Sequence, residues 1–222
     1  SFVGGLVGRN IANIISSKAT GSINGVDDKV GGLTGYSLGE IRNSTSKATV
    51  SATRRVGGLV GKLDGGTVYR SHTESEVSAD NGRAGVLVGE NSGGTIDLSY
   101  SKGSVSANDY TGGLVGDNKG PISNSYARAS VSGRDFVGGL VGRNKQSSVT
   151  SAYTVPDVTG STDVAAVIGR NEGGTATDIY WDTESSTASA GIGSDDNGQT
   201  VTPLTTSEMQ GLSASENMDF NW

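Results

Sequence analysis

The sequence predicts an all-β fold, a parallel β-solenoid with three strands in each coil of about 27 residues. The first observation is a glycine-rich hexapeptide, VGGLVG or a close variant, which occurs seven times at intervals of 26 to 28 residues. The second is a pair of apolar columns between successive copies, and the third is the composition, with 36 glycines among 222 residues. Such a repeat is typical of coils that stack on one another. Because parallel crossovers are generally right-handed, we expect a right-handed β-helix of six to seven coils.

The hexapeptide supplies the first side of each coil and places one leucine in the predicted core. The resulting column is Leu6, Leu33, Leu59, Leu87, Leu114 and Leu140, with Val167 in the last copy. The residue that follows each of these positions is also apolar in most copies, as at Val60 and Val115. In a regular strand it would point outward and form an apolar ridge for docking. We favour the alternative, in which a bulge at the glycines turns it inward.

The second and third sides of the coil each add one apolar column. The first of these columns is Ile14, Ile41, Val68, Ile96, Ile122 and Val149. The second, nine residues later, is Ile23, Val50, Val77, Val105, Val131 and Val158. Valine, isoleucine, threonine, serine and tyrosine dominate these sides, and glycine, asparagine and aspartate separate them. Since no repeat contains ten residues of helical periodicity, the sides are predicted to be strands.

Two polar or small positions also recur in the hexapeptide region. Its last glycine never changes from Gly8 to Gly169, which predicts either a corner with positive φ or a place where only hydrogen fits. Two residues later, asparagine occurs in five of the seven copies, and Ser37 and Leu63 replace it in the others. We therefore expect a ladder of stacked side-chain amides.

Segments between the hexapeptides resemble a known repeat. GGTIDLSYSKGSVSA at 93–107 and GPISNSYARASVSG at 120–133, together with VGGLVGxN, are similar to the GLUG repeat of large bacterial surface and secreted proteins. These proteins include filamentous-haemagglutinin-like adhesins and some immunoglobulin A proteases. The resemblance covers about residues 1–182 and implies an extracellular or cell-surface setting. It carries over no catalytic residue.

The repeat pattern weakens after residue 174, which divides the chain into GLUG-type solenoid coils at 1–176 and a C-terminal cap or lead-in segment at 177–222. The last coil of a solenoid exposes its core and strand edges, so it needs a cap. Within this segment, Thr205 and Glu208 have the spacing of a capping box. A short helix is therefore predicted near 206–211.

The first coil begins inside a strand, at Phe2 and Val3. Such an edge either continues into further repeats of a longer protein or pairs with a second copy of the chain. Because the two predicted ends differ, self-association would run head to tail and would build a filament.

Few residues are candidates for chemistry. Asp109, Asp135 and Asp163 are predicted at the same turn of three consecutive coils, as ordinary turn residues or as weak Ca²⁺ ligands. Carboxylates on one wall of a β-helix are also what polysaccharide-cleaving enzymes require. The chain has no cysteine and one histidine, His72, which excludes thiolate catalysis and multi-histidine metal sites. We therefore predict no catalytic residue, no cofactor and no enzymatic activity.

His72 shares a column with Tyr100, Tyr126 and Tyr153. If this column faces outward, the tyrosines are a candidate ligand platform; otherwise they form a stack at the rim of the core. The net charge of −6 without a basic stripe argues against a nucleic-acid partner. No apolar run is long enough for membrane insertion.

These observations favour a non-catalytic repeat module of a bacterial extracellular or cell-surface protein. It would act as a rigid stalk or as an adhesion segment that meets a host or matrix carbohydrate or protein. Two alternatives stay open at this point: a protomer of a head-to-tail stacked extracellular filament, and a carbohydrate-binding or carbohydrate-cleaving β-helix. The sequence names no ligand or receptor.

Overall fold

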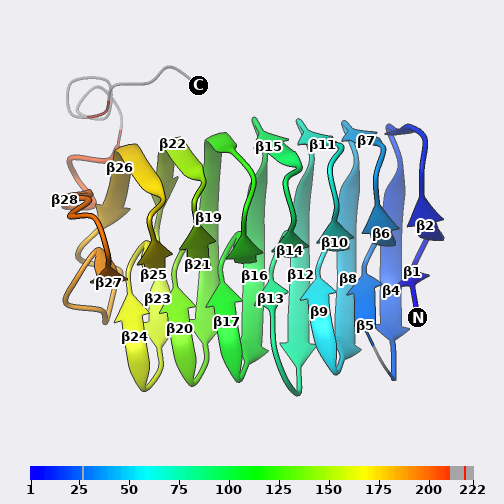
Figure 1. Cartoon of the computed structure of the whole chain (residues 1–222), viewed down its shortest axis with the longest axis horizontal. Coiled ribbons are helices and arrows are strands. Elements are labelled where there is room, and N and C mark those ends of the chain that lie inside the picture. The colour runs from blue at the N-terminus through cyan, green and yellow to red at the C-terminus, as the bar shows by residue number, and fades with distance from the viewer. Residues whose placement is uncertain (27, 211–217, 219–222) are drawn as a thin grey trace.

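The computed structural model describes residues 1–26, 28–210 and 218, and its coils stack along one axis from the N-terminal to the C-terminal end (Figure 1). All the strands that it pairs are parallel, and each lies beside its counterpart one coil later. The predicted all-β parallel solenoid is therefore confirmed, but most of the described coils contain four strands in place of the predicted three. Among the described residues, no helix is long and apolar enough to cross a membrane.

Three sheets form the walls. Sheet A contains β1 (Val3–Gly4), β5 (Asp28–Gly31), β9 (Arg54–Gly57), β13 (Ala84–Gly85), β17 (Asp109–Gly112), β20 (Asp135–Gly138) and β24 (Thr162–Ala165). Sheet B contains β2 (Val7–Asn10), β6 (Thr34–Ser37), β10 (Val60–Leu63), β14 (Val88–Asn91), β18 (Val115–Asn118), β21 (Val141–Lys145), β25 (Ile168–Glu172) and β27 (Ile192–Asp195).

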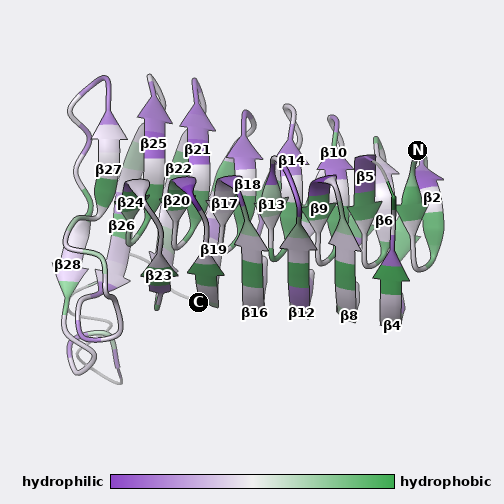
Figure 2. Cartoon of the chain, turned by 90° about the horizontal axis from the view of Figure 1, so that it is seen from below, coloured by the Kyte–Doolittle hydropathy of each residue, from purple (hydrophilic) through white to green (hydrophobic). Residues whose placement is uncertain are grey.

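Sheet C is the widest wall, because most coils contribute two strands to it. Its strands are β3 (Ile14–Ile15), β4 (Lys18–Asn24), β7 (Glu40–Arg42), β8 (Thr45–Ala52), β11 (Thr67–Tyr69), β12 (His72–Ala79), β15 (Thr95–Asp97), β16 (Tyr100–Ala107), β19 (Ile122–Ser132), β22 (Ser148–Thr154), β23 (Asp157–Thr159), β26 (Thr175–Asp182) and β28 (Thr202–Leu204). Hydrophilic and hydrophobic segments recur at the same place in successive coils (Figure 2).

The core is divided into two parallel lines of apolar side chains. The first packs the leucine column and the residues after it, such as Val60 and Val115, against the isoleucine column of sheet C. The second packs the valine column of sheet C against the valines of sheet A. The apolar residue after the leucine column therefore points inward from the third coil to the seventh, as expected. It does so because the leucine lies at the corner between sheets A and B, where the direction of the chain changes.

Most of the predicted core side chains are buried, and one is not. Leu33, Leu59, Leu87, Leu114, Leu140, Ile41, Ile96, Ile122, Val50, Val77, Val105, Val131 and Val158 are each at most 4% exposed. Leu6 is 53% exposed, because β1 and β2 have a neighbouring coil on one side only in the described structure. The expectation that Leu6 lies in the core is therefore wrong for this structure.

The invariant glycine is explained by close approach and not by positive φ. A Cβ added at Gly142 would lie 2.6 Å from the carbonyl oxygen of Gly116 and from the carbonyl carbon of Tyr110. Neither Gly142 nor its counterparts in the other coils has positive φ. Positive φ occurs instead at non-glycine corners, for example 47° at Leu98 and 57° at Phe136. The neighbouring coils impose this backbone, and the residue types gave no sign of it.

The asparagine column forms the predicted amide ladder. Asn91 Nδ2 donates to Asn118 Oδ1 at 2.9 Å, and Asn118 Nδ2 donates to Asn144 Oδ1 at 2.9 Å. Asn144 Nδ2 continues to Asn171 Oδ1 at 3.0 Å. The ladder ends on the carboxylate of Asp195, 2.7 Å from Asn171 Nδ2. Because these amides are buried, the ladder satisfies polar groups that water does not reach.

The C-terminal segment continues the solenoid further than the sequence suggested. β26 stays in register with β22 through Trp181, and β27 and β28 add a shortened coil on top of it. The predicted boundary at 176 therefore falls inside a strand. Trp181 is 7% exposed and packs in the first core line.

The predicted helix near 206–211 is a turn over its described residues, and residue 211 lies outside them. The capping-box hydrogen bonds do form: the backbone N–H of Thr205 donates to Glu208 Oε2 at 2.7 Å, and the N–H of Glu208 donates to Thr205 Oγ1 at 3.3 Å.

Candidate functional site

The aromatic column lies on the outer face of sheet C. Along β16, Ser101 points into the core and is fully buried, whereas the preceding residue, Tyr100, faces outward and is half-buried. The ring centroids of His72 and Tyr100 are 4.5 Å apart, those of Tyr100 and Tyr126 are 4.8 Å apart, and those of Tyr126 and Tyr153 are 4.7 Å apart. Interplanar angles of 4° to 8° make this a continuous stack.

This geometry limits what the column can bind. Each ring covers a face of the next, so the column presents ring edges and not the broad faces on which a sugar ring would stack. Burial raises the pKa of Tyr153 to about 12, which keeps its phenol neutral. Loss of solvation lowers the pKa of His72, which favours its neutral form in the stack. The column is therefore outward-facing, as a ligand platform requires, but its main contacts are internal.

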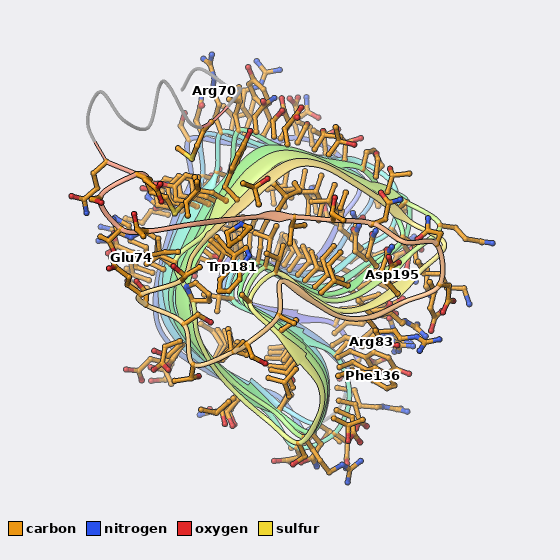
Figure 3. The ribbon with its side chains drawn as sticks, turned by 90° about the vertical axis from the view of Figure 1, so that its left-hand side faces the viewer. Arg70, Glu74, Arg83, Phe136, Trp181 and Asp195 are labelled. Atoms are coloured by element: carbon orange, nitrogen blue, oxygen red, sulfur yellow. The ribbon has the colours of Figure 1, made fainter. Side chains whose placement is uncertain are left out.

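A second set of polar side chains lies where sheets A and B meet. This set, called the notch below, consists of Arg55, Arg83, Glu90, Asp117 and Arg143. Glu74 and Arg83 project from opposite sides of the molecule in the view along the axis (Figure 3), with Arg83 in the notch near Phe136. Arg83 Nε lies 2.7 Å from Asp117 Oδ2, and Arg143 Nε lies 2.9 Å from Asp117 Oδ1. The Asp117 side chain is completely buried. Because Arg83 directly precedes β13 and Asp117 belongs to β18, the first ion pair links the sheet A side to sheet B, whereas the second lies within sheet B.

Arginine side chains of the notch also contact Glu90 and a pair of stacked aromatic rings. Arg55 Nε lies 2.5 Å from Glu90 Oε2, and Arg83 Nη1 lies 3.2 Å from the same oxygen. The Arg143 guanidinium lies 4.5 Å from the centroid of Tyr110, which stacks on Phe136. The sequence did not indicate this network, because Arg55 and Glu90 are 35 residues apart and their pairing depends on how two sheets meet.

The three aspartates predicted to share one turn do not share one position. Asp109 lies opposite Asp135, but Asp135 lies opposite Thr162. Asp163 is therefore one residue further along the coil, at a corner with φ of 49°. The leucine column already indicates this offset, because Asp109 and Asp135 lie five residues before Leu114 and Leu140, whereas Asp163 lies four residues before Val167.

Arg134 occupies the space between the first two carboxylates. Its Nη2 lies 2.9 Å from Asp109 Oδ1, and its Nε lies 2.9 Å from Asp135 Oδ2. This arrangement is that of an exposed ion-pair cluster, so Ca²⁺ at Asp109, Asp135 or Asp163 stays a prediction. Within the described part of the chain, no group of three or more histidine, aspartate or glutamate side chains is placed to hold a metal ion.

The comparison with family models identifies the GLUG motif at residues 3–24, the first coil. This match confirms the resemblance that the sequence indicated. Comparison with curated proteins and with solved structures gives no match. The family match supports the repeat architecture, and it is silent about a ligand.

Proposed function

We propose that the chain is a non-catalytic repeat module of a bacterial extracellular or cell-surface protein, acting as a rigid stalk or an adhesion segment. The observation that carries this proposal is the continuous register of the coils, supported by the GLUG motif in the first of them. GLUG-type repeats are typical of surface and secreted proteins. A chain of this kind needs stiffness and an exposed lateral face, and it needs no reaction centre.

Stiffness follows from the way in which the coils are joined. Each inner coil forms backbone hydrogen bonds with both of its neighbours, and the buried asparagine ladder adds side-chain bonds in the same direction. Bending the rod would stretch many of these bonds at once. Seven coils at the strand spacing of about 4.8 Å give a rod roughly 30 Å long.

The candidate chemical groups of the chain are engaged in structural contacts. His72 is stacked on Tyr100, and Arg134 binds both Asp109 and Asp135. We therefore expect no turnover of acidic or neutral polysaccharides. Hydrolysis that disappears in an Asp135→Asn variant would contradict this expectation.

Surface labelling of intact cells tests the proposal. Antibodies against this chain should label intact cells of the producing bacterium, or recover the protein from the medium, while an antibody against a cytoplasmic protein should not label them. Labelling that appears only after lysis would contradict the proposal.

The first coil is where the filament alternative can be tested. In the first coil, Phe2 is 43% exposed, Leu6 53% and Ile15 53%, and β1, β2 and β3 each pair on one side only. A second copy stacked on this edge would cover these side chains. Analytical ultracentrifugation over a range of concentrations separates the surface module from the filament. A chain that sediments as a monomer at every concentration would exclude self-stacking.

A further inference from the structure

A furrow runs along the outer face of sheet C, parallel to the solenoid axis and beside the aromatic column. Its central part is a hollow of about 470 Å³. A second hollow of about 380 Å³ shares Thr49 and Glu76 with it, and a third of about 280 Å³ shares Ser130 and Asp157. The three hollows form one continuous depression that extends from β4 to the segment after β26.

The two banks of the central hollow are rows of short polar side chains, one from each coil. The first bank is Thr49, Glu76, Ser104, Ser130 and Asp157. The second bank is Ser78, Ser106, Ser132 and Thr159. Each row repeats at the strand spacing of about 4.8 Å, so five coils span roughly 19 Å.

The furrow offers side-chain hydroxyl groups along both of its banks. Val77, Val105 and Val131 contribute to its floor, but their side chains point into the core and are at most 4% exposed. The serine and threonine side chains of the two banks form no side-chain hydrogen bond with another described residue. They are exposed or half-exposed, so a ligand can reach them.

We propose that this furrow binds an extended, uncharged glycan that lies along the solenoid axis. The inference rests on the proposed function and specifies its adhesion role. Serine and threonine hydroxyls both donate and accept hydrogen bonds, and sugar hydroxyls do the same. A polymer with a hydroxyl-bearing unit at regular intervals is the partner that such a periodic double row fits, because every coil can repeat the same contact.

Other occupants fit the furrow less well. An extended peptide binds at a free sheet edge, but the backbone groups beneath the furrow already pair with neighbouring coils. An amphipathic helix needs large exposed side chains as apolar anchors, and the valine side chains of the floor are buried in the core. A polyanion would meet the carboxylates of Glu76 and Asp157 on the first bank.

Affinity electrophoresis tests the proposal with defined polymers. The chain is run in native gels that contain laminarin, dextran, xyloglucan or galactomannan, and in gels that contain alginate or no polysaccharide. Retardation is expected in at least one neutral glycan gel. The double variant Ser104→Val, Ser130→Val should raise the dissociation constant for that glycan at least tenfold, because it removes two hydroxyls from the middle of the first bank.

A matched control separates the furrow from the rest of the sheet. The double variant Thr175→Val, Thr177→Val also removes two exposed hydroxyls from sheet C, on β26 and outside the furrow. It should bind as the unchanged chain does. Valine suits outward strand positions, so both variants should keep the melting temperature of the parent chain, which thermal denaturation verifies.

Three results would overturn the inference. They are the absence of retardation by every neutral glycan, retardation by alginate alone, and equal loss of binding in the two double variants. Because the assay uses the purified chain, these results leave the surface-labelling test unaffected. Surface labelling without retardation by any neutral glycan would therefore reject the proposed glycan ligand but not the proposed surface module.

Discussion

Asn118 shows how one side chain stabilises three coils. Its amide accepts a hydrogen bond from Asn91 and donates one to Asn144, and the residue is completely buried. An asparagine can do both at once because its side chain carries a carbonyl and an NH₂ group. Leu63 occupies the same position in the third coil without a ladder bond and packs in the core instead. The column thus tolerates an apolar residue at this position, where the neighbouring side chains of Ser37 and Asn91 form hydrogen bonds with the backbone.

Replacing Asn118 by alanine should lower the free energy of unfolding by about 1–3 kcal/mol, because it leaves Asn144 Oδ1 without its donor in a buried site. Urea denaturation followed by circular dichroism measures the change. Asn24→Ala is the control, since Asn24 is exposed on β4, and its effect should stay within about 0.5 kcal/mol. Equal stabilities of the two variants would contradict a structural ladder.

At Gly142 the constraint is space. A methyl group there would meet the backbone of the preceding coil at 2.6 Å, and a backbone contact cannot be relieved by rotating a side chain. We expect Gly142→Ala to destabilise the fold by about 3 kcal/mol or more, at or beyond the upper end of the usual cost of overpacking. Gly93→Ala is the control, because Gly93 has φ of 98° with open space around it. Its cost should be nearer 1 kcal/mol, from backbone strain, and thermal melting compares the two.

At the scale of elements, the Arg83–Asp117 ion pair of the notch ties the segment before β13 to sheet B. Burial alone would raise the pKa of Asp117, but its hydrogen bond with Arg143 and the charges of Arg143, Lys119 and Arg83 hold it below its usual value. A carboxylate that is buried and paired in this way contributes stability only while it is ionised. The notch therefore makes the joint between the two sheets sensitive to acid.

The sign of this dependence follows from the lowered pKa of Asp117. The stabilisation is complete above the pKa of the unfolded carboxyl, about 4, and it is lost as the pH falls through the lower folded value. The melting temperature should thus fall below about pH 4. In Asp117→Asn the fall should be shallower, from a fold already weakened by about 3–5 kcal/mol at pH 7, because the buried pair is broken.

Calorimetry between pH 7 and pH 2 measures these curves. Asp80→Asn, at an exposed position, is the control and should follow the parent chain. A parallel fall in Asp117→Asn and the parent would show that other groups cause the acid sensitivity.

At the scale of the whole molecule, stability is distributed along one dimension. Both core lines run through every coil, and each coil packs on its neighbours. In such a structure a local defect weakens the coils next to it more than the distant ones. The centre of the rod is therefore where a core substitution does the most damage.

Leu114→Asp should unfold the central coils, because it places an unpaired carboxylate in a site that is completely buried. Hydrogen exchange measured by mass spectrometry should show lost protection at about residues 84–142. Ser106→Asp, on the exposed face of β16, should keep full protection. Unchanged cooperative melting of Leu114→Asp would contradict the core assignment.

The architecture was predictable because a solenoid repeats its local environment. Three apolar columns with one residue in each coil suffice to predict a parallel solenoid with an internal face. They do not show that the hexapeptide is divided between sheets A and B while the other two columns share sheet C. Leu114, Ile122 and Val131 are buried for this reason. The misplacement of Asp163 was avoidable, because the 27 residues between Leu140 and Val167 already place Thr162 opposite Asp135.

The sequence by itself determined the repeat, the strands and the columns, since a position that recurs every coil must satisfy the same packing each time. Only the tertiary structure decided which outward residues meet. The bend between sheets A and B brings Arg83 to Asp117, and the spacing of neighbouring coils turns the tyrosines into a stack with covered faces. Periodicity specifies contacts between equivalent residues of adjacent coils. Contacts between different walls depend on the angles at the corners, which are set by the packing of the whole coil.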